Sequence, residues 1–320
     1  MKVVIPGGTG QVGALLARAF LARGDDVVLL SRGGQGEART VSWDGRTLGD
    51  WAREVDGADA VINLAGRSVN CRYTEENLRQ MMDSRVDSTR VVGQAIQQAA
   101  KPPRVWLQMS TATVYAHRLD APNDESTGII GGSEPGVPAY WKRSIDIALA
   151  WERTLAEADT PHTRKVAMRT AMVMSPDREG IFDVLLGLTR RGLGGPAGSG
   201  RQYVSWIHDR DFVRAVRLLL ERDDLAGPVN LAAPNPLPQK EFMAKLREAA
   251  HVGVGLPAAK WMLEVGAFFM RTDTELLLKS RRVVPGRLLD AGFTFEYPDW
   301  GTAVTNLVER WRAGGGPVRS

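Results

Sequence analysis

The chain has 320 residues, of which 43% are hydrophobic and 24% are charged, so it can bury a full core and is neither disordered nor fibrous. Its 41 Lys and Arg are scattered and are balanced by 37 Asp and Glu, which excludes a basic arm for nucleic acid. Cys71 is the only cysteine, so no intramolecular disulfide can form and we expect a reducing, cytoplasmic location. No apolar run approaches the ~20 residues that cross a bilayer. We therefore expect neither nucleic acid nor a membrane as a partner.

In the first half of the chain, short apolar runs alternate with longer amphipathic stretches. The expected strands are 3–5, 27–30, 61–64, 105–109 and 166–168, with helices between most of them. Runs without polar alternation indicate strands buried on both faces, as in a parallel sheet covered by helices. The pattern predicts an α/β fold with a Rossmann-type, doubly wound parallel sheet.

Beyond Ser175 the pattern changes. A glycine-rich loop at 192–200 precedes an expected strand at 203–207, a helix at 209–222 and a strand at 228–231. From Pro236 onward the residues predict mostly helices, interrupted by prolines. We expect residues 1–178 to form a nucleotide-binding domain, with 203–232 completing its sheet. Residues 179–202 and 233–320 are expected to form a smaller, mostly helical lobe that covers a substrate cleft.

Glycines at 7, 10 and 13 directly follow the first expected strand. Their spacing alone is weak, because about 0.4 such matches arise by chance at this glycine content. Their position is more specific, since an amphipathic helix follows them. Glycine permits a tight turn, and the N–H groups of a helix N-terminus bind a pyrophosphate. We expect this loop to hold a dinucleotide through Gly7, Thr9, Gly10, Gln11, Val12 and Gly13.

The end of the second expected strand indicates which dinucleotide is bound. Enzymes that prefer NAD usually carry an acidic residue here, which holds the ribose 2′-hydroxyl. This chain has Ser31 and Arg32 instead. A hydroxyl and a guanidinium favour a 2′-phosphate, so we expect NADP(H) as the cofactor. The alternative is a solvated arginine in a loop.

Several motifs resemble the atypical extended short-chain dehydrogenase/reductases known as the epimerase family, or sugar-nucleotide epimerase-like proteins. The resemblance covers nearly the whole chain. It rests on Asn63-Leu64-Ala65-Gly66, residues 83–89 and 110–115, Gly198–Gln202 with Ser205-Trp206-Ile207-His208, and residues 278–285 and 291–298. The last two stretches are similar to the uncharacterised domain that closes this family.

The resemblance implies roles for residues outside the glycine loop. It places Asn63, Leu64, Ala65, Gly66 and Arg85 at the cofactor, and Arg169 to Val173 as a wall of the nicotinamide pocket; Met109 is a further expected cofactor contact. For the apolar positions, plain core packing is the alternative. Substrate contacts are expected from Gln202, Ser205, Trp206 and His208.

Catalysis in this superfamily uses a Ser or Thr that orients the substrate, a Tyr as acid or base, and a Lys four residues later. Thr111 resembles the first element, with a backbone-bonded hydroxyl as the alternative. The Tyr-Lys pair is missing. One register puts Ser144 and Ala148 at these positions, and another puts Tyr140 and Ser144 there. Our hypothesis is that Tyr140 supplies the acid, with Lys142 or an arginine setting its pKa. The alternative is a tyrosine packed at a helix start.

His208 can exchange protons near neutral pH, or it can orient the start of a helix capped by Asp209. No His or Cys spacing predicts a metal site. The predicted function is that of an NADP(H)-dependent oxidoreductase or epimerase acting on a polar, sugar-like small molecule, and a homodimer is a further expectation. A non-catalytic NADP(H)-binding sensor or scaffold is the alternative. A third class, an interaction module, would use Trp261, Phe268 and Phe269.

Overall fold

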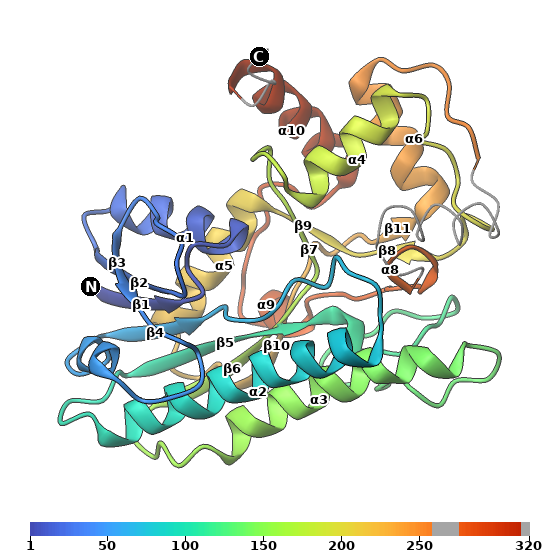
Figure 1. The fold of residues 1–320 in the computed structure, drawn as a ribbon. Coiled ribbons are helices and arrows are strands. Elements are labelled where there is room, and N and C mark those ends of the chain that lie inside the picture. The colour runs from blue at the N-terminus through green and yellow to red at the C-terminus, as the bar shows by residue number, and fades with distance from the viewer. Residues whose placement is uncertain (258–274, 315–320) are drawn as a thin grey trace.

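A computed structural model of the chain describes residues 1–257 and 275–314. Its centre is a seven-stranded parallel sheet in the order β10-β6-β5-β4-β1-β2-β3 (Figure 1). The strands are β1 Lys2–Pro6, β2 Asp26–Ser31, β3 Arg39–Ser42, β4 Ala60–Asn63, β5 Val105–Thr111, β6 Arg164–Thr170 and β10 Gly227–Leu231. The predicted fold class is confirmed. The short edge strand β3 was not among the strands expected from the sequence.

Helices cover both faces of the sheet. One face packs against α1 Gln11–Leu21 and α5 Asp209–Glu221, and the other against α2 Glu75–Gln98 and α3 Lys142–Glu157 (Figure 1). Successive strand residues face opposite layers: Val3 and Ile5 pack with α1 and α5, whereas Val4 lies in the α2 layer. Both kinds of position are therefore apolar, which explains why the strands show no polar alternation.

A second group of helices forms a lobe apart from α2 and α3 (Figure 1). It contains α4 Ile181–Arg190, α6 Gln239–Ala250 and α10 Trp300–Gly314. Trp300 is its central side chain, stacked on Phe242 with ring centroids 4.0 Å apart and tilted against Trp206 at 5.0 Å. The remaining helical segments are η1 Asp50–Glu54, η2 Ala112–Val114, η3 Ala139–Trp141, α8 Glu275–Leu278 and α9 Gly286–Asp290.

Two small sheets lie between the main sheet and this lobe. β7 Met172–Met174 pairs in parallel with β9 Trp206–His208, and β8 Tyr203–Val204 pairs antiparallel with β11 Leu237–Pro238. The single strand expected at 203–207 is thus two strands separated by Ser205, and neither joins the main sheet. β10 does join it, beside β6. In the described residues no helix is long and apolar enough to cross a membrane. Trp261, Phe268 and Phe269 lie outside the described residues.

Candidate active site

A cavity of about 440 Å³ opens at the carboxyl ends of β1, β4, β5 and β6. Open α/β sheets bind ligands at this edge, where the loops after parallel strands meet. The cavity brings together twelve of the predicted site residues, namely Gly7, Gly10, Gln11, Val12, Gly13, Leu64, Gly66, Arg85, Met109, Thr111, Ser144 and Val173. Other lining residues, which the sequence analysis did not single out for the site, include Arg67, Tyr73, Thr113, Ile147 and Trp151.

Glycine occupies the three positions of the loop after β1 for different structural reasons. Gly7 has φ +75°, and a Cβ there would lie 2.8 Å from the Ala65 backbone. A Cβ on Gly13 would lie 2.4 Å from the Gly8 carbonyl oxygen, so α1 could not pack this closely. Gly10 is unlike these two, since a Cβ there would meet its nearest atom at 3.5 Å. Gly10 therefore keeps open the approach to the α1 N-terminus, which has no side-chain cap.

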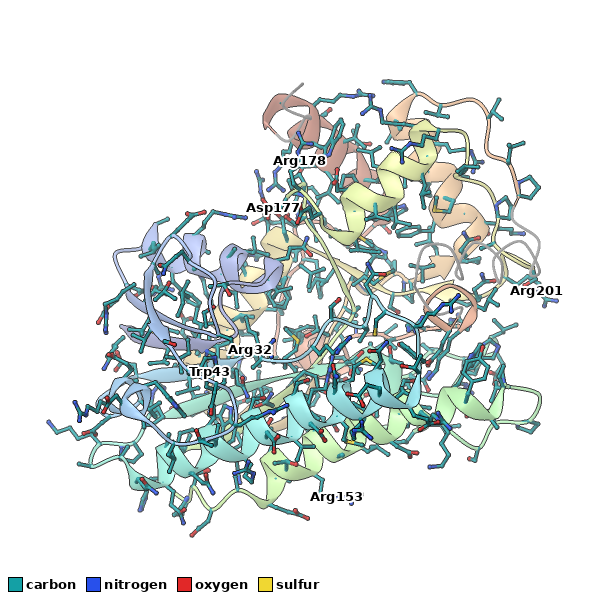
Figure 2. All side chains as sticks on the ribbon, in the orientation of Figure 1. Arg32, Trp43, Arg153, Asp177, Arg178 and Arg201 are labelled. Carbon is teal, nitrogen blue, oxygen red and sulfur yellow. The ribbon has the colours of Figure 1, made fainter. Side chains whose placement is uncertain are left out.

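The Ser31 hydroxyl shapes the turn after β2. It accepts a hydrogen bond from the Gly34 backbone N–H at 2.9 Å and lies 3.2 Å from the Thr9 hydroxyl. The next residue, Arg32, is exposed beyond the end of the strand (Figure 2). Among the described residues no carboxylate pairs with Arg32, so its guanidinium remains available to an anion.

The turn after β4 is built around Asn63, whose side chain is completely buried. Its amide donates to Gln108 Oε1 at 2.9 Å, and its Oδ1 accepts from the Ala65 N–H at 3.1 Å. Asn63 therefore holds the turn and does not reach the cavity. Only Leu64 and Gly66 of the predicted turn residues line the cavity.

Arg85 faces Gly66 from α2 and carries a half-buried charge into the cavity wall. Its guanidinium lies 4.9 Å from the Trp151 ring centroid and donates to the Met81 carbonyl oxygen at 3.0 Å. No carboxylate in the described ranges pairs with it, and burial lowers the pKa of Arg85 to about 10. The residues lining the cavity include Arg67 and Arg85 but no Asp or Glu. The cavity therefore favours an anionic ligand.

Two of the predicted catalytic hydroxyls lie in this cavity. Thr111 ends β5, and its Oγ1 accepts from the Thr113 N–H at 3.2 Å. Ser144 lies on α3, and its Oγ is within hydrogen-bond distance of the Trp141 carbonyl oxygen (2.9 Å) and of Glu275 Oε1 (2.6 Å). Both hydroxyls can contact an oxygen of a ligand in the cavity.

Residues 3–232 match the NAD dependent epimerase/dehydratase family. The chain belongs to this family. Residues 258–307 match a second domain, described only as a domain of unknown function, DUF1731. The predicted resemblance is confirmed on both counts.

Relatives cover nearly the whole chain. It is 31% identical over 313 residues to epimerase family protein SDR39U1 of Homo sapiens (96% of this chain, 100% of that protein). It is 27% identical over 315 residues to epimerase family protein YfhF of Bacillus subtilis (96% and 98%). The crystal structure of human SDR39U1 isoform 2 with NADPH shares the fold at a TM-score of 0.84 and 29% identity (97% and 99%). UDP-N-acetylglucosamine 4-epimerase from Bacillus cereus shares the fold alone, at a TM-score of 0.74 and 16% identity (98% and 99%).

The structure of this family member does not support Tyr140 as the acid. Tyr140 lies on η3 with 41% of its surface exposed, and it is not among the residues that line the cavity. The next residue, Trp141, takes the buried position of this turn. Lys142 points to Asp146, with which it pairs at 2.5 Å.

Arg169 does not line the cavity either. It is a buried partner of Glu152, with two nitrogen–oxygen distances of 2.9 and 2.8 Å, and it also donates to the Tyr115 hydroxyl at 3.0 Å. Glu152 in turn accepts from the Ser110 hydroxyl at 2.6 Å. This network lies beneath the cavity, and Val173 lines the cavity instead of Arg169.

The four predicted substrate residues are all buried, and none lines the cavity. Gln202 donates to the Ala197 carbonyl within its own loop at 2.9 Å. Ser205 donates to the Arg281 carbonyl at 2.6 Å, which joins β8 and β9 to the C-terminal segment. Trp206 packs in the core of the helical lobe. The structure does not bring these four side chains to the cavity, because the polar loop faces protein.

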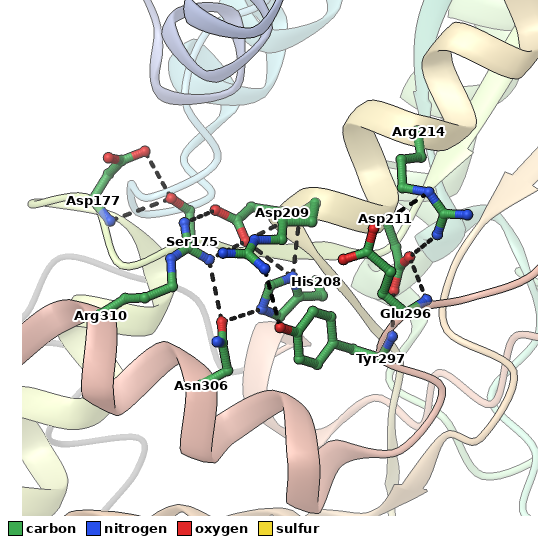
Figure 3. A network of polar contacts seen from close by, with 11 residues as sticks. Ser175, Asp177, His208, Asp209, Asp211, Arg214, Glu296, Tyr297, Asn306 and Arg310 are labelled. Atoms are coloured by element: carbon green, nitrogen blue, oxygen red, sulfur yellow. Dashed lines mark hydrogen bonds and ion pairs between the residues drawn. The ribbon is translucent and has the colours of Figure 1, made fainter.

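His208 is structural (Figure 3). It is the N-cap of α5, and its Nδ1 accepts from the Arg210 N–H at 3.2 Å, so the prediction that Asp209 caps this helix is wrong. The imidazole stacks on Tyr297 with ring centroids 3.8 Å apart, and its Nε2 lies 3.2 Å from Asn306 Oδ1. Burial lowers the pKa of His208 to about 4, so the ring is neutral at physiological pH.

Asp209 instead pairs with Arg310 through contacts of 2.8 and 2.7 Å, which fix α5 to α10 (Figure 3). Within the described ranges, no group of three or more His, Cys, Asp or Glu side chains could hold a metal ion.

Proposed function

We propose that this chain binds NADP(H) in the cavity and is an oxidoreductase or epimerase that acts on a polar, sugar-like small molecule. The observation that carries the proposal is that an open glycine loop and the half-buried Arg85, which pairs with no carboxylate of the described residues, line the same cavity. The NADPH bound to human SDR39U1 supports the choice of cofactor.

The residues present fit a dinucleotide. Space above Gly10 and the uncapped N-terminus of α1 suit a pyrophosphate, and Arg85 supplies a cation from the opposite wall. Arg32 is placed to bind a 2′-phosphate beyond β2, since its planar guanidinium can donate two hydrogen bonds to one phosphate. When bound, NADP(H) supplies or accepts a hydride.

The chain's own part in such a reaction is to orient the substrate and move a proton. Thr111 and Ser144 offer hydroxyls in the cavity for a substrate oxygen. Apolar lining residues, including Met109, Ile147 and Val173, exclude water from the same space. A substrate with a hydroxyl or carbonyl group suits these contacts.

A non-catalytic NADP(H)-binding sensor or scaffold is the second candidate. It is favoured by one observation: α3 presents Ser144 and Ala148 to the cavity in place of a Tyr-Lys pair. Turnover with a carbonyl probe separates this candidate from the enzyme.

The first experiment is titration of the purified protein with NADPH and with NADH, followed by fluorescence. Arg32→Asp should weaken NADPH binding on the order of tenfold to a hundredfold, because it replaces a charge-assisted contact with repulsion. NADH binding should change little. Arg153→Asp is the matched control, since Arg153 is an exposed arginine on α3, far from Arg32 (Figure 2). Absence of binding to either nucleotide would overturn the proposed function.

A further inference from the structure

A buried cluster of charged residues lies directly behind the cavity wall that α3 forms. Glu275, on α8, and Lys279 are both 0% exposed, and Lys279 Nζ lies 3.6 Å from Glu275 Oε1. Glu275 Oε1 is also 2.6 Å from the Ser144 hydroxyl, which lines the cavity. The three side chains form one continuous polar path from the cavity into the C-terminal segment.

The C-terminal segment is also fixed to the cavity wall at Thr113. Lys279 Nζ donates to the Thr113 carbonyl oxygen at 2.8 Å, and Arg281 Nε donates to Thr113 Oγ1 at 3.0 Å. Thr113 itself lines the cavity, next to the end of β5. Lys279 is thus held by a neutral carbonyl on one side and by the Glu275 carboxylate on the other.

Such a pair is not explained by stability alone. Burying a carboxylate and an ammonium together costs desolvation energy, and apolar residues of similar volume often stabilise a protein equally well. A buried ion pair whose carboxylate contacts a hydroxyl in a ligand cavity has the arrangement of a general base with its proton carrier.

We propose that Ser144 and Glu275 carry the acid–base chemistry of this protein, and that Lys279 is a positioning residue that keeps Glu275 ionised. The proposal rests on the proposed function. It assigns a task to the domain of unknown function, since residues 275 and 279 lie within its match at 258–307. On α3, Ser144 and Ala148 replace the Tyr-Lys pair of the superfamily. In this proposal Glu275 and Lys279, from the C-terminal segment, supply the titratable groups instead.

In this proposal, oxidation of a substrate alcohol moves one hydride and one proton. The C–H bond breaks and its electron pair leaves as hydride to the oxidised nicotinamide. The alcohol O–H proton passes to Ser144 Oγ while the Ser144 proton passes to Glu275. The products are a carbonyl compound, reduced nicotinamide and a neutral Glu275 carboxylic acid. Ser144 ends in its initial form, and carbonyl reduction follows the same path in reverse.

The electrostatics of Lys279 agree with this role. The pKa of Lys279 is lowered to about 8, mainly by burial and also by the Arg281 charge, although Glu275 and Glu134 oppose this shift. The pKa of His117, which follows β5, is lowered by burial and also by the Lys279 charge. Below about pH 8 the Lys279 ammonium forms an ion pair with Glu275, and above this pH the lysine charge and the ion pair are lost.

The first test follows NADP⁺ reduction with acetoin as the alcohol probe, the direction in which an ionised Glu275 accepts the proton. Ser144→Ala and Glu275→Gln should each lower kcat about a hundredfold with unchanged NADPH affinity. The double variant should be no slower than either single variant, because both act on one proton path. Thr154→Val is the control, since the Thr154 hydroxyl donates only to the Ala150 carbonyl of the same helix, away from the cavity.

A second test uses Lys279 and includes the apoprotein. Lys279→Met should remove the alkaline decline in kcat near pH 8, whereas Lys279→Arg should retain activity and shift the decline to higher pH. In the apoprotein, the NMR signal of the Lys279 Cε carbon should titrate near pH 8. The midpoint should fall in Glu275→Gln, which removes the nearby anion. Circular dichroism checks folding, and Glu275→Gln/Lys279→Met keeps the site neutral if the single variant unfolds.

The outcomes separate the two proposals. NADPH binding with unchanged turnover in Ser144→Ala overturns the proton path and leaves the proposed function standing. An apoprotein midpoint at the ordinary lysine value overturns the role of Lys279. Wild-type protein that binds NADP(H) but does not reduce NADP⁺ with acetoin also overturns the proton path and favours a binding protein. No NADPH binding overturns the proposed function itself.

Discussion

Acidification should destabilise this protein through His208. The imidazole is 0% exposed, and burial lowers its pKa to about 4, whereas an unfolded histidine titrates near its usual value of 6.5. Between these two values the unfolded state binds a proton that the folded state does not. The free energy of unfolding is therefore unaffected above pH 6.5 and falls as the pH drops toward 4.

The magnitude follows from the two pKa values. A difference of about 2.5 units corresponds to about 3 kcal/mol over the full range, of which about 2 kcal/mol is lost between pH 7 and pH 5. Urea unfolding at these two pH values measures the change.

His208→Asn is the comparison variant, because asparagine can cap α5 but does not titrate. Its own loss of stability between pH 7 and pH 5 should be smaller by about 2 kcal/mol. Equal losses in the wild type and in this variant would refute the reasoning, since the pH dependence would then come from other groups.

Two further predictions concern the glycine loop and the network beneath the cavity. Gly13→Ala should lower the melting temperature and weaken NADPH binding, because its Cβ would lie 2.4 Å from the Gly8 carbonyl; Gly10→Ala should weaken binding with an unchanged melting temperature. Equal melting temperatures for the two variants would contradict the packing argument. Arg169→Met should cost about 3 kcal/mol of unfolding free energy, because it leaves the Glu152 carboxylate buried without its partner. In denaturant unfolding, Arg169→Met/Glu152→Met should recover part of this loss. An Arg169→Met variant as stable as the wild type would contradict the argument from the ion pair.

The local patterns of the sequence were sufficient for the sheet and for much of the cofactor site. Val3, Val4 and Ile5 are all apolar because the strand is covered on both faces, and such a run can be recognised without knowing its neighbours. Gly13 packs against Gly8 of the same short loop, and Gly7 has a positive φ in the tight turn that opens it. Interactions of this kind are encoded in spacing, so they could be predicted.

Only the tertiary structure decided which polar residues face the cavity. Trp206 and His208 lie in a polar motif that was expected to face the cleft. In the structure they are covered by the helical lobe, which includes α10. Conversely, Ser144 meets Glu275 across 131 positions of sequence. No local periodicity encodes such a meeting, because it depends on how the C-terminal segment packs against α3. The sequence therefore determined the sheet and the glycine loop that line the cavity, and long-range packing determined which other side chains face it.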